Sequence, residues 1–482
     1  MPLSPIQLDR HADDHLYHQL FQQLRGQIAD GTLRTGEKLP TIRALAEALQ
    51  VNTVTVVNAY RCLEEEGLIH KQVGSGSFVS PIREAGPALQ EETELRQLNL
   101  SHGAYNFASG TPTSDLFPVA RFKDVLNQVL DRDQGEAFGY HDPQGYYPLR
   151  QAIAEVIAAQ GMAVGPEGLQ IISGAQQGID IVSKALLKYG DTVLVEAPTY
   201  AGALATFRSR GVRAESFSIG PQGPDLNRLE AQLRKHRPRL LYLMPNFHNP
   251  TGWTYPDTAK IEVLKLCSLY GAAILEDDYA SELSFSGEAV RPLKAYDAED
   301  RVIYIKSFSK IMMPGLRLGL MTIPPHLTEA ILSAKQSTDV STFGLTQRAF
   351  QLFIEKGYWH QQVAAVRQVF QARYETFLRV SETLLVPPLE LSAPGGGIHF
   401  WFKVPGSAAE ALVAEAARRG VLVVPGDHFF LQPDSEKYLR LSTASMDPPA
   451  IEKGLELFAD AVGAVLGRSR SQNRPGAYMP IL

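Results

Sequence analysis

The chain has 482 residues, enough for roughly two to four domains at ~150 residues per domain. Its 44% hydrophobic and 20% charged residues are typical of a soluble globular protein, and no apolar run approaches the ~18 residues of a membrane-spanning helix. The net charge of −6 gives no global argument for binding to nucleic acid. The two cysteines are far apart in the sequence and indicate neither a disulfide framework nor a metal site. Because the N-terminus lacks a secretory signal, we expect a cytoplasmic protein.

The first eighty residues follow the order helix, helix, helix, two-stranded hairpin. Residues 15–31 carry apolar side chains at helical spacing and stop at a glycine, residues 41–50 form a second amphipathic pattern, and Asn52 or Thr53 can cap a third helix. Residues 68–80 are typical of two short strands around a Gly-Ser-Gly turn. This order predicts a winged helix-turn-helix domain over residues 1–80; the alternative is a small helical docking module.

The charge of this segment is mildly acidic, because seven Arg and Lys stand against nine Asp and Glu. DNA binding therefore rests on the placement of residues and not on bulk charge. A recognition helix reads bases with its N-terminal residues, while phosphates take hydroxyls, backbone amides and arginine. The candidate DNA-binding residues are Arg43, Thr53, Thr55, Lys71, Gly74, Ser75 and Gly76.

Residues 31–79, from GTLRTGEKLPTIRALAEALQ through QVGSGSFV, resemble the DNA-binding domain of GntR-type bacterial regulators over essentially the whole segment. Members of that family often have a serine-arginine pair ahead of the recognition helix, and here Asn52 and Thr53 occupy those positions, whereas Arg43 is kept. The resemblance implies that Arg43, Thr53, Thr55 and the wing tip contact operator DNA, mostly its backbone.

Residues 81–105 mix prolines, glycines and charges, which indicates a linker. Residues 106–467 alternate strand-like and helical runs, which predicts βαβ units in an α/β domain whose sheet is largely parallel. The last part of this segment favours a smaller α+β domain, and the polar residues 468–482 are expected to form a loose tail. In such sheets, functional residues collect beyond the carboxyl ends of the strands.

Polar residues follow several of the predicted strands at those ends. Small residues and free amides at a helix start can hold an anion, and an aromatic ring can stack on a flat ligand. A buried carboxylate needs a partner. A desolvated lysine amine can form a Schiff base. The residues are Ala175, Gln176, Tyr200, Asn249, Asp277, Tyr279, Ser307, Lys310 and Arg317. Each alone has an ordinary structural interpretation, as a helix start, a core aromatic, a turn, a cap or a solvated lysine. Together they supply the set of groups that pyridoxal 5′-phosphate requires.

From about Phe107 to Gly467 the chain resembles a fold-type I aminotransferase of the kynurenine and α-aminoadipate type. The resemblance implies that Lys310 is the imine lysine, that Asp277 pairs with the pyridine nitrogen, and that Asn249 and Tyr279 hold the ring hydroxyl. It assigns the phosphate to Ala175, Gln176, Ser307 and Arg317. Tyr140 matches a tyrosine that reaches the phosphate of the neighbouring subunit, which implies a homodimer, and Arg440 matches the arginine that clamps a substrate or effector carboxylate.

With a GntR-type domain in front of this segment, the chain resembles the MocR/GabR regulators. We therefore expect a transcriptional regulator that binds operator DNA and senses an amino acid or amine, which displaces Lys310 and forms an external aldimine with the cofactor. Transaminase activity is expected to be absent or weak. The alternative is an active aminotransferase with an accessory winged domain, and a third possibility is a DNA-binding protein whose cofactor is structural.

Overall fold

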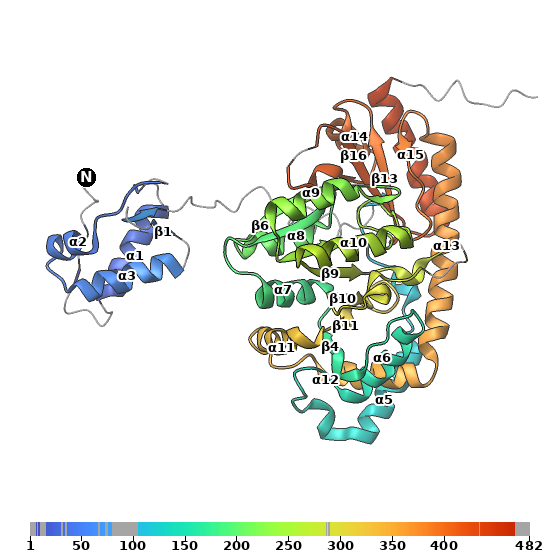
Figure 1. The fold of residues 1–482 in the computed structure, drawn as a ribbon. Helices are drawn as coiled ribbons and strands as arrows, with labels where there is room; N and C mark the ends of the chain where they lie inside the picture. The colour runs from blue at the N-terminus through green and yellow to red at the C-terminus, as the bar shows by residue number, and fades with distance from the viewer. Residues whose placement is uncertain are drawn as a thin grey trace, which may run out of the picture. The chain divides into compact units, whose positions relative to one another are not determined.

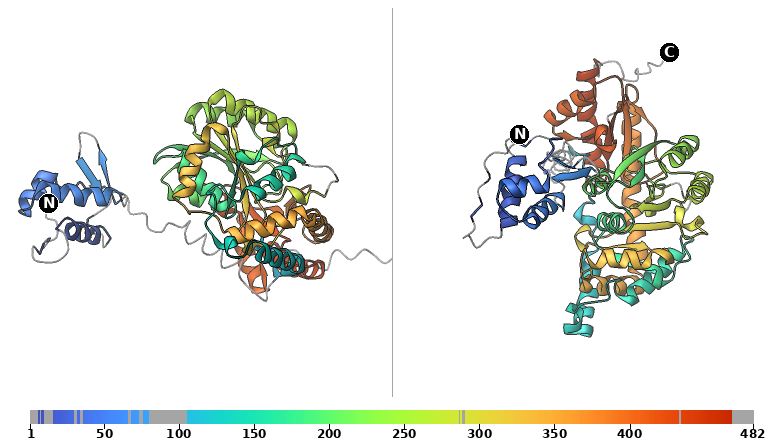
Figure 2. Two further views of the ribbon diagram at one scale, coloured as in Figure 1. Left: turned by 90° about the horizontal axis from the view of Figure 1, so that it is seen from below. Right: turned by 60° about the vertical axis from the view of Figure 1, so that its left-hand side comes forward.

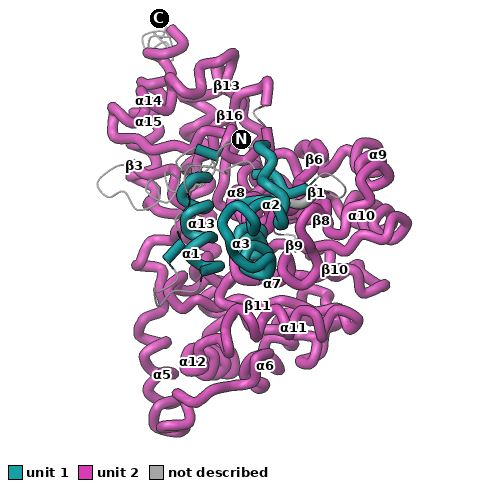
Figure 3. The backbone as a smooth tube through the Cα atoms, turned by 90° about the vertical axis from the view of Figure 1, so that its left-hand side faces the viewer, with its two compact units in different colours: residues 1–87 teal, residues 88–482 magenta. Residues whose placement is uncertain are grey.

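The computed structural model describes residues 6, 8–9, 16–29, 32–33, 36–65, 68–72, 76–79, 105–285, 287, 290–432 and 434–467. The chain divides into two compact units, residues 1–87 and residues 88–482 (Figure 3), which we call the N-terminal and the C-terminal unit. Most of the expected linker and the whole expected tail lie outside the described residues, as do Gly74 and Ser75 and the side chain of Lys71.

The N-terminal unit has the predicted winged helix-turn-helix order. It contains α1 (Leu16–Ala29), α2 (Ile42–Ala48), α3 (Thr53–Glu65), β1 (Ile69–Gln72) and β2 (Gly76–Val79), and the two strands pair antiparallel. Of the two predicted caps of α3 the structure uses Asn52, whose Oδ1 accepts a hydrogen bond from the Val54 amide at 2.9 Å. Its small apolar core includes Leu20, Leu24, Val56 and Leu63.

The C-terminal unit is built on an eight-stranded sheet in the order β4-β11-β10-β9-β8-β5-β6-β7. The strands in this order are β4 (Leu169–Ile172), β11 (Gly319–Thr322), β10 (Val302–Ser307), β9 (Ala273–Asp278), β8 (Leu240–Leu243), β5 (Thr192–Ala197), β6 (Arg213–Gly220) and β7 (Gly223–Pro224). The five strands from β10 to β6 are parallel, whereas β11 runs antiparallel to both β10 and β4. All residues of β4, β8 and β10 are buried, as expected where both faces of a parallel sheet are covered.

Helices cover both faces of this sheet (Figure 2). They are α5 (Val119–Asp133), α6 (Tyr147–Ala158), α7 (Ala175–Leu186), α8 (Ala201–Ser209), α9 (Leu226–His236), α10 (Asp257–Tyr270), α11 (Thr328–Gln336) and α12 (Gly344–Glu355). On one face Gly178 of α7 lies so close to Ile305 of β10 that a Cβ there would come within 2.7 Å of it. The next residue, Lys306, faces α6 and α12 on the other side.

A smaller layer follows the long helix α13 (Tyr358–Leu384), which runs along one side of the C-terminal unit to α15 (Figure 1). Its elements are β12 (Glu390–Leu391), β13 (His399–Val404), α14 (Ala409–Arg418), β14 (Val421–Leu422), β15 (Val424–Pro425), β16 (Lys437–Ser442) and α15 (Pro448–Leu466). The early strand β3 (Tyr105–Asn106) joins this layer by pairing with β14. The layer has its own core, in which the rings of Phe377 and Phe400 stack at 3.9 Å. None of the described helices is long and apolar enough to cross a membrane.

Candidate cofactor and effector site

Lys310 lies in the loop that follows β10 and is half-buried. Its Nζ donates a hydrogen bond to the carbonyl oxygen of Gly110 at 2.7 Å. Burial lowers the pKa of the Lys310 amine to about 8, and the nearby Arg440 cation lowers it in the same direction. An appreciable fraction of this amine is therefore neutral near physiological pH, as imine formation requires.

The pKa of Lys310 leads to a testable pH dependence. We expect the rate at which the cofactor-free protein takes up pyridoxal 5′-phosphate to rise with pH, with its midpoint at about 8, because only the neutral amine attacks the aldehyde. Removing the Arg440 charge in Arg440→Gln relieves the repulsion, so the pKa of Lys310 and the midpoint should move to higher pH. Absorbance-monitored reconstitution measures both curves, and an unshifted midpoint in Arg440→Gln would contradict the electrostatic assignment.

Asp277 is the last residue but one of β9 and lies beside β10, where its Cα is in register with Ile305. Its Oδ2 accepts a hydrogen bond from the Tyr242 hydroxyl at 2.9 Å, while its Oδ1 is buried and has no hydrogen-bond partner in the described part of the chain. Burial raises the pKa of this carboxyl to about 7. A buried carboxylate oxygen without a partner fits a protonated ring nitrogen, which would supply both the proton and the charge.

The start of α7 and the loop between β10 and β11 meet where the phosphate is predicted. Gly174 has a φ of +96°, and a Cβ there would lie 2.7 Å from Nη2 of Arg317, which donates to the Ser173 carbonyl oxygen. The side chain of Gln176 is already used, since it donates to Gly202 and Thr206. Gln176 and Ala175 thus offer their backbone amides at the start of a 12-residue helix, where anions are favoured.

Three further predicted cofactor residues surround this region. The Tyr200 hydroxyl donates to Oε1 of Gln176 at 3.3 Å, so the aromatic ring lies beside the phosphate cradle. Ser307 is buried at the end of β10, and its Oγ accepts from the Ser309 amide at 3.3 Å. The Tyr279 hydroxyl donates to the Phe247 carbonyl oxygen at 2.6 Å.

Arg440 reaches this site from β16 of the smaller layer. Its Nη1 donates to Oδ1 of Asn249 at 3.2 Å and its Nη2 to the Ala108 carbonyl oxygen at 2.6 Å, and its Nε is buried without a partner in the described residues. The guanidinium lies 5.1 Å from the centre of the Phe429 ring, and burial lowers its pKa to about 10. Both of its hydrogen-bond partners are neutral oxygens, so the buried cation is suited to an additional anion.

Two histidines near this centre were not among the predicted site residues. His248 precedes Asn249, and its Nε2 lies 3.2 Å from Glu196, which also accepts a hydrogen bond from the Tyr255 hydroxyl at 2.5 Å. His399 of β13 has a buried Nδ1 without a described partner, and burial, followed by the Arg440 and Lys310 cations, holds its pKa well below the usual range. For His399 and Glu196 the available signal in the sequence was a titratable residue in an otherwise apolar strand, whereas His248 lies in the loop after β8.

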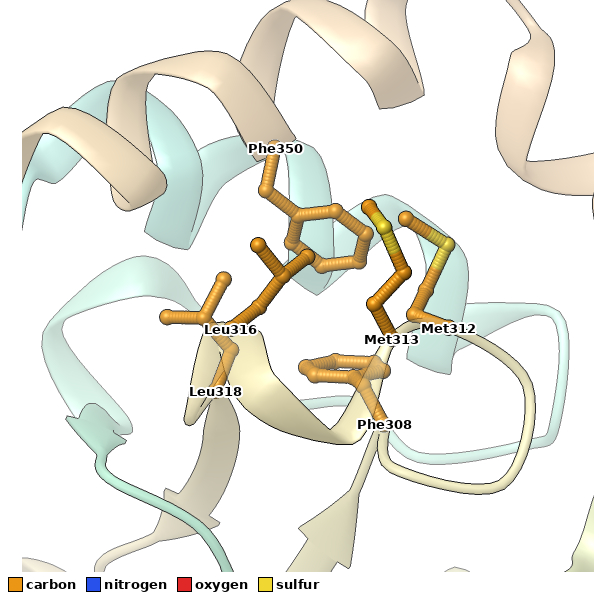
Figure 4. Close-up of a pocket in the computed structure, with 6 residues that line it drawn as sticks. All are labelled: Phe308, Met312, Met313, Leu316, Leu318 and Phe350. Atoms are coloured by element: carbon orange, nitrogen blue, oxygen red, sulfur yellow. The ribbon is translucent and has the colours of Figure 1, made fainter. Parts of the chain in front are cut away.

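An apolar pocket lies behind the loop that carries Lys310 and Arg317 (Figure 4). The pocket is lined by Phe308, Met312, Met313, Leu316, Leu318 and Phe350. The rings of Phe308 and Phe350 are in contact, with centroids 4.8 Å apart and planes tilted by 59°. This packing anchors both ends of the loop and so fixes where the amine and the guanidinium emerge.

Not every predicted residue joins the buried site. The side chain of Tyr140, after the short 3₁₀ helix η2 (Gln134–Phe138), is 88% exposed and so stays outside the buried site of its own chain. In the N-terminal unit Arg43 and Thr53 are exposed, Thr55 is half-buried, and Gly76 begins β2 with a φ of +118°. No group of three or more His, Cys, Asp or Glu among the described residues is placed to hold a metal ion.

The comparison with protein families finds two matches. The family of class I and II aminotransferases matches residues 96–458, and the gntR family of bacterial regulatory proteins matches residues 16–79. The 2-aminoadipate transaminase of Thermus thermophilus is 36% identical over 379 residues, 77% of this chain and 94% of that protein. The probable rhizopine catabolism regulatory protein MocR of Rhizobium meliloti is 27% identical over 472 residues, 94% of this chain and 95% of that protein.

The fold has close counterparts among solved structures. The α-aminoadipate aminotransferase LysN from Thermus thermophilus, complexed with N-(5′-phosphopyridoxyl)-L-leucine, superposes with a TM-score of 0.72. It is 34% identical and covers 79% of this chain and 98% of its own. The predicted fold, a winged helix-turn-helix followed by a fold-type I aminotransferase domain, is thus confirmed.

Proposed function

The chain belongs to the class I and II aminotransferase family and carries a GntR-type domain in front of it, and from this premise we propose that it is a transcriptional regulator of the MocR type that uses pyridoxal 5′-phosphate to sense an amino acid. The observation that carries the proposal is the combination, in one chain, of a winged helix-turn-helix, a half-buried lysine of lowered pKa, Lys310, and a buried oxygen of Asp277 without a partner in the described part of the chain. When bound, the cofactor supplies an aldehyde that captures a primary amine.

Three residues of the site would each bind a different group of the cofactor or the ligand. Asp277 would hold the ring nitrogen, Lys310 would hold the aldehyde carbon until an incoming amine replaces it, and Arg440 would take the carboxylate of the ligand. Arg440 and Lys310 lie close enough for the guanidinium to lower the pKa of the amine. A ligand with both a primary amine and a carboxylate, an amino acid, therefore uses the site better than an amine alone.

A homodimer is part of this proposal. Phe138, Tyr140, Val340 and Phe343 are exposed apolar or aromatic side chains of the C-terminal unit. Their two segments lie side by side, because a Cβ at Gly344 would overlap the His141 ring. A second copy covering this surface would bring its own Tyr140 toward the neighbouring phosphate site. Sensing would then reach the DNA if the ligand binds one arrangement of the dimer more tightly than the other. Because operator DNA is bound where the DNA is, the proposal includes a cytoplasmic location.

Binding of the cofactor-loaded protein to the DNA upstream of its own gene tests the proposal. With competitor DNA at near-physiological salt, where non-specific contacts weaken, we expect sequence-dependent binding that a panel of amino acids changes. Replacing Arg43 by Ala should weaken binding about tenfold and reduce the salt dependence by about one phosphate contact. The matched control is Arg234→Ala, which removes an exposed arginine from α9 and should leave binding unchanged.

A protein that does not bind operator DNA would call for the other function. Absence of specific binding under every cofactor and ligand condition would favour the alternative, an aminotransferase with an accessory winged domain, since relatives at 36% and 30% identity are named as transaminases. Steady-state conversion of an amino acid and keto acid pair at about 1 s⁻¹ or faster would support that alternative directly.

A further inference from the structure

Two valines are exposed on the outer face of α3. The side chains of Val54 and Val57 are 58% and 43% exposed, and their spacing of three residues places them next to each other on one face of the helix. The opposite face packs into the core through Val56, Ala59, Tyr60 and Leu63. Val54 and Val57 therefore contribute little to the folding of the N-terminal unit and are available to a partner.

The polar groups at the start of α3 are largely occupied within the chain. Oδ1 of Asn52 accepts from the Val54 amide at 2.9 Å, which caps the helix, and the Thr53 hydroxyl donates to the same oxygen at 3.4 Å. An oxygen used as a cap is not free to accept from a base without uncapping the helix. Beside these polar groups, the start of α3 presents the methyl groups of Val54 and Val57 outward.

The charge of the N-terminal residues also favours recognition of DNA by apolar contact. Residues 1–80 hold seven basic against nine acidic side chains, so phosphate contacts can supply only part of the affinity. The helix-turn-helix geometry places the N-terminal residues of the second helix of the motif, here α3, in the major groove. The apolar group that base edges present in that groove is the 5-methyl of thymine.

We infer that Val54 and Val57 contact thymine 5-methyl groups of the operator, so that α3 recognises A·T base pairs by apolar contact. The inference rests on the proposed binding of operator DNA by the N-terminal unit and specifies the chemistry of that recognition. Arg43 and the wing then position the helix on the backbone, and the valines select the sequence.

Deoxyuridine substitution tests the inference, because it removes only the 5-methyl and keeps the base pair. The full-length, cofactor-loaded protein is footprinted on the DNA upstream of its gene, and each protected thymine is replaced in turn. At one or more positions we expect the dissociation constant to rise roughly threefold to fivefold, the value of one buried methyl group. In Val54→Ala or Val57→Ala the affinity for the thymine duplex should fall, and the difference between thymine and deoxyuridine at the matching position should disappear.

The control is Val119→Ala, an equally exposed valine (62%) of the C-terminal unit, which should keep full discrimination. Because alanine favours a helix more than valine does, folding of the variants is expected to be unimpaired, and thermal unfolding checks this.

Equal affinity for all thymine and deoxyuridine duplexes, with binding still weakened by Arg43→Ala, would overturn the inference and leave DNA binding intact. If the valine variants weaken binding to both duplexes equally, the valines do not recognise the thymine methyl, and the inference is wrong. Loss of all sequence-dependent binding in the unaltered protein would refute the proposed function and the inference together.

Discussion

The Lys310→Ala protein is expected to carry no covalently attached cofactor and to lose the response of DNA binding to amino acids. Lys310 is a half-buried amine with a lowered pKa in the loop between β10 and β11, and its Nζ donates a hydrogen bond to the Gly110 carbonyl oxygen. Alanine has no nucleophile to replace it, so the loss should be complete and not graded. Borohydride reduction followed by peptide mass mapping should place the pyridoxyl group on Lys310 in the unaltered protein and on no lysine in the variant.

Lys310→Arg is the matched control for the charge. It keeps a cation that can donate to the Gly110 carbonyl oxygen but cannot form an imine. If the cation alone sustained sensing, this variant would respond to amino acids while Lys310→Ala would not. We expect both to fail; a normal response of Lys310→Ala on DNA would refute the sensing hypothesis.

The Asp277→Asn protein is expected to bind pyridoxal 5′-phosphate about 10- to 100-fold more weakly. A hydrogen bond to a charged group contributes about 1.5–3 kcal/mol, and the neutral amide cannot keep the ring nitrogen protonated. The oxygen that would accept a hydrogen bond from the ring nitrogen is Oδ1 of Asp277, because Oδ2 already accepts one from the Tyr242 hydroxyl. Titration of the cofactor-free protein, followed by fluorescence, gives the dissociation constants.

Tyr242→Phe serves as the comparison for this variant. It removes the hydrogen bond to Oδ2 but keeps the carboxylate, so its effect on cofactor affinity should be clearly smaller than that of Asp277→Asn. Unchanged affinity in Asp277→Asn, or an equal loss in both variants, would show that Asp277 acts by supporting the fold and not by pairing with the ring.

Local patterns in the sequence predicted much of the fold. The run VIYIKS is a fully buried strand, and the groups that follow β5, β8, β9 and β10 do gather at one edge of the sheet. Asn52 caps α3 through a side-chain hydrogen bond to a residue only two positions away. Such features depend on neighbouring residues, so spacing and residue type are sufficient to indicate them.

Contacts set by strand order could not be predicted in the same way. Tyr242 supports Asp277 because β8 lies beside β9, and in sequence it looks like any core tyrosine. Gly110 meets Lys310 across 200 positions. The antiparallel strand β11 also departs from the βαβ alternation, since it returns directly beside β10. These contacts depend on how the whole domain folds, so they leave no periodic pattern in the sequence.

The hydrogen bonds of Arg440 have a consequence for which ligands the site rejects. A carboxylate that binds this guanidinium competes with two oxygens that already occupy it, those of Asn249 and Ala108. Esters, amides and simple alkylamines bring no negative charge to compensate for the displaced hydrogen bonds, each of which contributes about 1.5–3 kcal/mol when the donor is charged. The hydrogen bonds that Arg440 makes within the protein thus favour ligands that carry a carboxylate, and we expect amines without a carboxylate to leave the regulator unchanged.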